Sequence, residues 1–241
     1  MNKHNINFIS NDWYSNSYMM SHSNKGYRYY VTIGSRGRGK TYSGKKYLAK
    51  KFAYRAMKHW NKAFDNGQEW KCVWGRLSQT AVDKVLENDG ASFFEPSILN
   101  KYGLVVKVIG DMVYFAKRSS HDGEDYDWKP FIRVMSISNY QHYKGNQFTD
   151  YDEIIMDELV RAKNERKTFD VSNAFKNFIE NIARDRPDVR CFIYGNAIDD
   201  LCIYNGSPTG SPISTIGSIF YNEDSCEMET ARMLYRLNPY Y

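Results

Sequence analysis

The chain has 241 residues, with 33 Lys and Arg against 28 Asp and Glu, which gives a net charge of +5. Its composition, 42% hydrophobic and 25% charged, is that of an ordinary globular protein and excludes a wholly disordered chain. No run approaches the roughly 20 apolar residues of a membrane span, and none of signal-peptide length follows the N-terminus. We therefore expect neither secretion nor a membrane partner. The mild positive charge permits a polyanionic partner without demonstrating one.

Short runs of β-branched and aromatic residues predict strands along the whole chain. In chain order these runs cover residues 29–33, 72–74, 105–109, 112–115, 131–137, 154–156 and 191–194. Two helices are predicted between them. The first covers 40–58, which is rich in Ala and Lys and lacks Pro, and the second follows Asp170, where apolar residues recur every three or four positions as far as Ala183. Strands that alternate with helices indicate an α/β fold with a mainly parallel sheet.

A phosphate-binding motif lies between the first predicted strand and the first predicted helix. The sequence GSRGRGKT at 34–41 fits the pattern G-x-x-x-x-G-K-[ST], in which backbone N–H groups surround phosphate oxygens. Lys40 supplies a cation for the β- and γ-phosphates, and the hydroxyl of Thr41 is a ligand for Mg²⁺. The alternative is a Gly-rich turn in a basic loop. The predicted nucleotide-binding residues are Gly34, Ser35, Arg36, Gly37, Arg38, Gly39, Lys40 and Thr41.

Two carboxylates, Asp157 and Glu158, follow the apolar strand at 154–156. An acid at the end of a buried parallel strand lies beside the phosphate loop and binds Mg²⁺. We predict that Asp157 shares the metal with Thr41, and that Glu158 orients and deprotonates an attacking water. The alternative is a strand that ends in two solvated acids. A carboxylate at the position of Glu158 separates NTP hydrolases from many small-molecule kinases.

Arginines supply the further candidates for catalysis. Arg184 and Arg186 follow the second predicted helix, where a guanidinium group suits an arginine finger that reaches the γ-phosphate of a neighbouring subunit. The alternative is that they complement the negative end of the helix dipole. Arg36 and Arg38, within the phosphate loop, are also suited to stabilise transition-state charge.

Three polar segments are more ambiguous. Asn196 follows the strand at 191–194 and is either a sensor of the γ-phosphate or an ordinary turn residue. Residues 140–147 mix aromatic, amide and basic side chains, which suits a nucleic-acid backbone or an adjacent active site, or else a solvated loop. The acidic residues within 121–127 fit no EF-hand or zinc spacing, so we interpret them as a solvated loop.

These motifs resemble those of viral genome-packaging ATPases, most closely those of small podoviruses with short linear genomes (Picovirinae type). Residues 30–42 are similar to the phosphate loop of that family, with Arg36 at its usual arginine. Residues 154–158 match its acidic strand, and 189–197 resemble its third motif. The resemblance implies a P-loop NTPase fold of the ASCE type, with a mainly parallel central sheet flanked by helices.

The resemblance also implies a function and its partners. In that family a homomeric ring, usually a pentamer, sits at the portal of the procapsid in the host cytoplasm and pulls double-stranded DNA inward with ATP and Mg²⁺. Carried over residue by residue, it implies nucleotide contact over 34–41, metal contact at Thr41 and Asp157, and base catalysis at Glu158. It also implies a trans-acting arginine at Arg184 or Arg186, and a residue near the pore or subunit interface at Lys144.

The domain organisation that we expect follows the extent of the resemblance. Residues 1–27 form an N-terminal extension, 28–200 the ATPase core, and 201–241 a segment leading to a linker. The second, nuclease-like domain of the family is expected to be missing. Two other functions remain open: a P-loop kinase that phosphorylates a small acceptor, and a nucleotide-dependent binding switch with negligible turnover.

Overall fold

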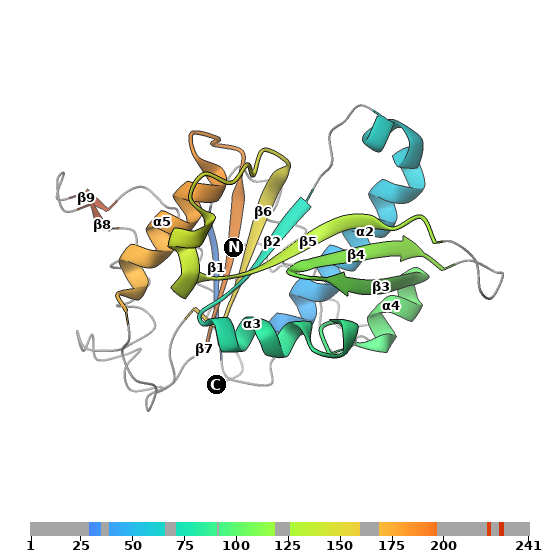
Figure 1. The fold of residues 1–241 in the computed structure, drawn as a ribbon, viewed down its shortest axis with the longest axis horizontal. Helices are drawn as coiled ribbons and strands as arrows, with labels where there is room; N and C mark the ends of the chain where they lie inside the picture. The colour runs from blue at the N-terminus through green and yellow to red at the C-terminus, as the bar shows by residue number, and fades with distance from the viewer. Residues whose placement is uncertain are drawn as a thin grey trace, which may run out of the picture.

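The computed structural model describes helices and strands over most of the middle of the chain (Figure 1). The described ranges are 29–34, 39–65, 71–90, 92–118, 126–159 and 169–196, with the short segments 221–222 and 227–228. The helices within them are α2 (Lys40–Asp65), α3 (Gln79–Leu86), α4 (Pro96–Tyr102) and α5 (Val171–Ala183), with 3-10 segments η1 (Asn88–Gly90) and η2 (Ile137–Tyr143). The main sheet consists of β1 (Tyr29–Gly34), β2 (Lys71–Arg76), β3 (Leu104–Ile109), β4 (Met112–Lys117), β5 (Lys129–Ser136), β6 (Tyr151–Asp157) and β7 (Arg190–Asn196). Strands β8 (Tyr221–Asn222) and β9 (Glu227–Met228) pair separately.

The seven-stranded sheet has the order β1-β7-β6-β2-β5-β4-β3. The first five strands in this order pair in parallel, and β4 and β3 extend the sheet as an antiparallel hairpin. Strand β7 lies between the strand that precedes the phosphate loop and the strand that ends in the two acids. The predicted α/β fold with a mainly parallel sheet flanked by helices is therefore confirmed.

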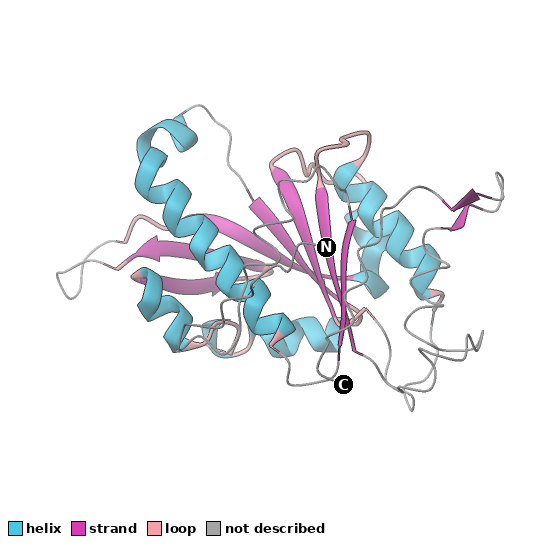
Figure 2. Ribbon diagram, turned by 180° about the vertical axis from the view of Figure 1, so that it is seen from behind, coloured by secondary structure: helices cyan, strands magenta, loops and turns pink. Residues whose placement is uncertain are grey.

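Helices cover both faces of the sheet. Figure 2 shows α2 crossing one face, where it shares a core with α3 and α4, while α5 covers the other face. In α5 the residues Phe175, Phe178 and Ile182 are buried against the sheet, as the apolar period of that segment predicts. None of the described helices combines the length and apolar character that crossing a membrane requires.

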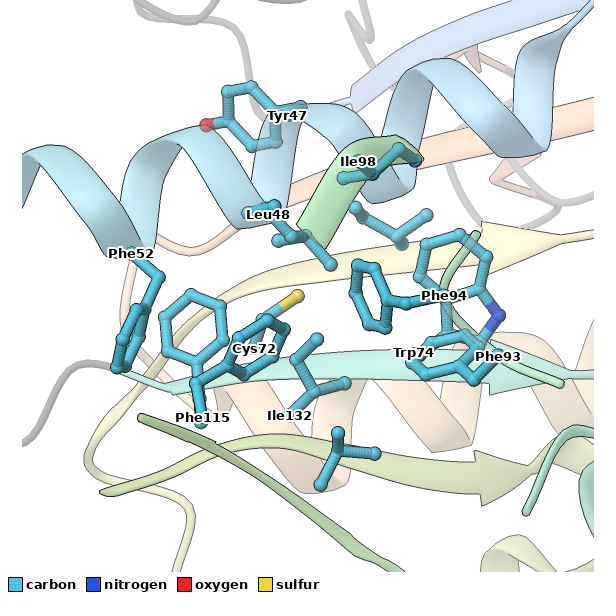
Figure 3. Packing of buried hydrophobic residues seen from close by; sticks show 14 of the residues in the cluster. Tyr47, Leu48, Phe52, Cys72, Trp74, Phe93, Phe94, Ile98, Phe115 and Ile132 are labelled. Carbon is cyan, nitrogen blue, oxygen red and sulfur yellow. The ribbon is translucent and has the colours of Figure 1, made fainter. Parts of the chain in front are cut away.

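Aromatic side chains form much of the core beneath α2 (Figure 3). Phe52 lies edge-on to Phe131 with ring centroids 4.9 Å apart, and Trp74 lies edge-on to Phe93 at 5.1 Å. Such edge-to-face pairs contribute about 0.5–1.5 kcal/mol beyond the area that they bury. Aromatic residues make up 16% of the chain, and some of them thus lie in the core.

The structure differs from the sequence predictions at several elements. Helix α2 continues past residue 58 to Asp65, and the strand predicted to end at 137 ends at Ser136, where η2 begins. Residues 140–143 belong to η2, so the prediction of a loop over 140–147 was wrong for its first half.

Helices α3 and α4 were not predicted, since each is too short to show an apolar period. Both depend on caps: the side chain of Ser78 accepts from the N–H of Ala81, and Gly103 ends α4 in the left-handed conformation.

Candidate active site

The carboxyl ends of the parallel strands bring the predicted site residues to one edge of the sheet. Strands β1, β2 and β6 end there at Gly34, Arg76 and Asp157, and α2 begins there at Lys40. Gly39 has a φ of 73°, which glycine adopts at little cost, and its carbonyl accepts the N–H of Ser43 at 2.7 Å. Residues 35–38 lie outside the described ranges, so the contacts predicted for Ser35, Arg36, Gly37 and Arg38 stay predictions.

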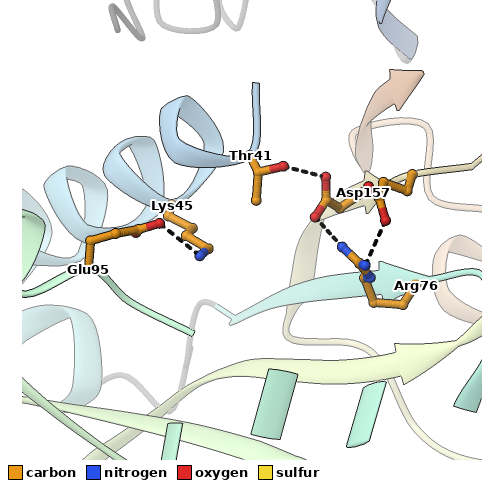
Figure 4. Close-up of polar contacts among 6 residues, drawn as sticks. Thr41, Lys45, Arg76, Glu95 and Asp157 are labelled. Atoms are coloured by element: carbon orange, nitrogen blue, oxygen red, sulfur yellow. Dashed lines mark hydrogen bonds and ion pairs between the residues drawn. The ribbon is translucent and has the colours of Figure 1, made fainter. Parts of the chain in front are cut away.

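Thr41 and Asp157, which are 116 positions apart in the chain, meet at this edge. The Thr41 hydroxyl donates to Oδ1 of Asp157 at 2.8 Å, and Asp157 is only 2% exposed (Figure 4). Burial raises the pKa of the Asp157 carboxyl, and this effect is opposed by Arg76 and by the Thr41 hydrogen bond. Hydroxyl and carboxylate oxygens are the hard ligands that Mg²⁺ prefers, so the two side chains fit the predicted metal.

Arg76 joins both acids and was not predicted from the sequence. Its Nη1 donates to Oδ2 of Asp157, and its Nη2 donates to Oε2 of Glu158 at 2.8 Å. Glu158 has a φ of 60°, a left-handed conformation that costs a residue with a side chain on the order of 1 kcal/mol or more. The only hint of Arg76 in the sequence was its place as a polar residue directly after the apolar run 72–75. The order of the strands, which places β2 beside β6, could not be inferred from it.

Lys40 and Lys45 face different partners, although both lie in the first two turns of α2. Burial lowers the pKa of the Lys40 ammonium, while the nearby charges of Asp157 and Glu158 raise it. Lys45 instead donates to Glu95 at 3.2 Å and lies over the ring of Phe93. Lys40 is thus the cation that accompanies the two acids, whereas the ammonium of Lys45 is engaged by Glu95.

The other predicted site residues lie elsewhere. Asn196 ends β7 beside Gly34, its register partner on β1, and its side chain lies outside the described part of the structure. Arg184 and Arg186 precede β7, and Lys144 precedes β6, so all three lie toward the amino ends of the parallel strands. The structure therefore brings Lys40, Thr41, Asp157 and Glu158 together and separates them from these three basic residues.

The two arginines make different contacts at that opposite edge. Among the described residues, the side chain of the exposed Arg184 donates one hydrogen bond, from Nη2 to the carbonyl of Asn146 at 3.0 Å. Arg186 is half-buried and pairs with Asp152 at 3.5 Å. Its guanidinium also donates to four main-chain carbonyls, those of Phe148, Thr149, Tyr151 and Ile182.

The sheet order defines an α/β domain with a mainly parallel sheet, in which the phosphate-loop sequence lies between β1 and α2. No protein-family model matches the sequence, and no curated protein sequence matches it either. Among solved structures, the chain is similar to the Phi-28 gp11 DNA packaging motor, with 19% identity and a TM-score of 0.53 over 77% of this chain and 50% of that one. It is also similar to the N-terminal domain of the DNA packaging ATPase from bacteriophage phi29, with 20% identity and a TM-score of 0.52 over 80% of this chain and 84% of that domain.

A third similarity is to the bacteriophage Phi-29 viral genome packaging motor assembly, with 23% identity and a TM-score of 0.53 over 78% of this chain and 48% of that one. The region matched thus spans about half the length of the packaging-motor chains. The predicted resemblance to viral packaging ATPases is confirmed at the level of the fold.

Proposed function

We propose that this chain is an ATP-hydrolysing domain of a motor that translocates double-stranded viral DNA into a procapsid. The observation that carries the proposal is the arrangement of Thr41, Asp157, Arg76 and Glu158 at one edge of the sheet, beside Lys40 and the phosphate-loop sequence. The similar proteins, whose names describe DNA packaging ATPases and motors, support the choice of substrate.

Each residue of the site has a role in hydrolysis under this proposal. Lys40 binds the β- and γ-phosphates of ATP, and Thr41 with Asp157 holds Mg²⁺, which when bound neutralises charge on the phosphates. Glu158 orients the attacking water and accepts its proton.

The exposed Arg184 is the better candidate for a trans-acting arginine. It lies at the amino ends of the strands, away from the phosphate loop of its own chain, and in the described part of the chain its side chain donates to one carbonyl. Arg186 is a poorer candidate, because its guanidinium is occupied by four carbonyls. An arginine that reaches only a neighbouring chain requires an oligomer, and we propose a homomeric ring, a pentamer in the complete motor, at the portal of the procapsid in the host cytoplasm.

Lys144 is the candidate for contact with DNA or with a neighbouring subunit. It is exposed at the end of η2, with its ammonium 5.8 Å from the ring centroid of Tyr140. A basic group beside an aromatic ring suits a phosphate backbone. Its position at the same edge as Arg184 is consistent with an interface between subunits.

Release of phosphate from ATP tests the enzymatic part of the proposal. We expect wild-type protein with Mg²⁺ to release phosphate, and double-stranded DNA to raise the rate. Glu158→Gln should lower the rate about 10²–10⁴-fold, as expected for loss of a general base. Glu180→Gln, on the exposed side of α5, is the matched control and should leave the rate unchanged.

Two other outcomes would favour the alternative functions. Transfer of the γ-phosphate to a small acceptor without net hydrolysis would indicate a kinase and contradict the motor. Binding of Mg²⁺–ATP with no release of phosphate, with or without DNA, would indicate a binding switch.

A further inference from the structure

Two acidic side chains are buried on the same strand, and only one of them belongs to the proposed active site. In the part of the chain that the structure describes, the buried acids are Glu153, with 0% of its surface exposed, and Asp157, with 2%. Both lie on β6 and are four residues apart, so they share one face of the sheet. Helix α2 covers that face and contacts both of them.

One carboxylate oxygen of Glu153 has three partners from two other elements. Its Oε1 accepts the hydroxyl of Tyr47 at 2.7 Å and also binds the ammonium of Lys51, both from α2. The guanidinium of Arg190, on β7, approaches the same oxygen at 2.9 Å. The other oxygen, Oε2, is buried with no hydrogen-bond partner among the described residues. Glu153 thus connects the helix that follows the phosphate loop to two central strands.

A contribution to stability does not by itself explain why the charged carboxylate of Glu153 is buried. Burying a carboxylate with its cations costs solvation free energy that the pairing only partly returns, and apolar side chains of similar volume often serve as well. Hydrogen bonds to a buried charge are directional, however, and they restrict where the donors can lie. The contacts of Tyr47 and Lys51 therefore fix the position of α2 along β6.

We propose that Glu153 is a positioning residue that holds α2 over β6, so that Lys40 and Thr41 lie opposite Asp157. This inference rests on the proposed function, since it assigns Glu153 a role toward the same nucleotide site. The direct link between the two elements at that site is the hydrogen bond from Thr41 to Asp157, and a bound Mg²⁺ ion would compete for both oxygens. Glu153 lies about 13 Å along the strand from Asp157, beyond the reach of the ion, so its contacts persist.

Glu153→Gln tests the proposal, because it keeps the shape of the side chain and removes its charge. Tyr47→Phe, which removes a single hydrogen bond, is a milder second variant in case the first folds poorly. The matched control is Ile154→Val, which alters the next residue of β6, a buried side chain in the core on the opposite face. The probe is a fluorescent, non-hydrolysable ATP analogue with Mg²⁺, and hydrogen exchange of α2 is followed without nucleotide.

We expect Glu153→Gln to weaken binding of the analogue about tenfold, as for the loss of a charge-assisted hydrogen bond, and Tyr47→Phe to weaken it less. Hydrogen exchange in the first turns of α2 should rise in both variants and stay unchanged in Ile154→Val. Unchanged exchange and affinity in Glu153→Gln, or equal effects in the control, would overturn the positioning role. If wild-type protein fails to bind the analogue, the proposed function fails instead, and the exchange measurement still decides whether Glu153 holds α2.

Discussion

Arg76 is the residue on which the charge balance of the site depends. Asp157 is almost inaccessible to water, so its negative charge is compensated by the Arg76 guanidinium and by the Thr41 hydroxyl. The side chain of Arg76 is only 17% exposed and therefore weakly screened. A buried carboxylate that loses its partner is costly, which makes this contact important for stability as well as for chemistry.

Replacing Arg76 by Ala should lower the free energy of unfolding by about 3–5 kcal/mol at neutral pH, as expected for a buried pair with one partner removed. Burial already raises the pKa of Asp157 above its ordinary value of 3.8, and the substitution raises it further. Between 3.8 and the raised pKa, the folded state keeps a proton that the unfolded state has released, so stability falls as the pH rises through that window. The loss in Arg76→Ala is therefore expected to be smaller at acidic pH.

Urea denaturation at several pH values measures this effect. Arg118→Ala, at an exposed arginine that follows β4, is the control and should change the free energy of unfolding by no more than about 0.5 kcal/mol. A loss in Arg76→Ala that is equally large at acidic and neutral pH would contradict the account given for Asp157.

At the scale of elements, Arg186 attaches the segment before β6 to the end of α5. It donates to carbonyls at 148, 149 and 151 on one side and to that of Ile182 on the other. The planar guanidinium presents several N–H groups at once, whereas an ammonium acts as a compact point charge. Lys144 lies four residues before this segment, and the carbonyl of Asn146, between the two, accepts from Arg184.

Arg186→Lys should lower the free energy of unfolding by about 1.5–3 kcal/mol, because a lysine cannot satisfy all of these carbonyls. Arg184→Lys is the matched control, since Arg184 is exposed and has one carbonyl contact, and its effect should stay within about 0.5 kcal/mol. Both are measured by urea denaturation. Equal effects of the two substitutions would show that the carbonyl contacts of Arg186 do not stabilise the fold.

The sequence predicted the elements that carry a long pattern and the residues that carry a motif. The apolar period of α5 and the β-branched runs of the central strands were sufficient for the fold class, and the pattern at 34–41 located Lys40 and Thr41. Helix α3 depends on one cap, which is a weak signal. Arg76 and Glu153 were missed because their roles depend on which strands are neighbours. Glu153 follows Asp152 and precedes the apolar run 154–156, so its burial is not evident from the sequence.

At the scale of the whole molecule, Arg184 and the phosphate loop with Lys40 lie at opposite edges of the sheet. Both are proposed to act on the same ATP molecule. A chain with Arg184→Ala keeps an intact phosphate loop, and a chain with Lys40→Ala keeps an intact arginine. We expect each variant alone to be inactive in DNA-stimulated phosphate release. Mixed rings contain some interfaces with both intact groups, so the mixture should recover part of the wild-type activity.

Subunit mixing followed by a phosphate-release assay makes this measurement, with a mixture of Lys40→Ala and wild-type protein as the reference for exchange between rings. Full activity of Arg184→Ala alone would exclude the trans-acting role. A mixture as inactive as its components, while the reference mixture exchanges normally, would also contradict it.

The separation of these two edges gives the molecule a direction. In a two-fold symmetric dimer, the arginine edge of each chain faces the phosphate-loop edge of the other only if the two chains lie side by side and antiparallel. A head-to-tail association also uses every chain in both roles, and such an association either closes on itself or grows without limit. The angle between successive subunits therefore decides between a finite motor and a filament.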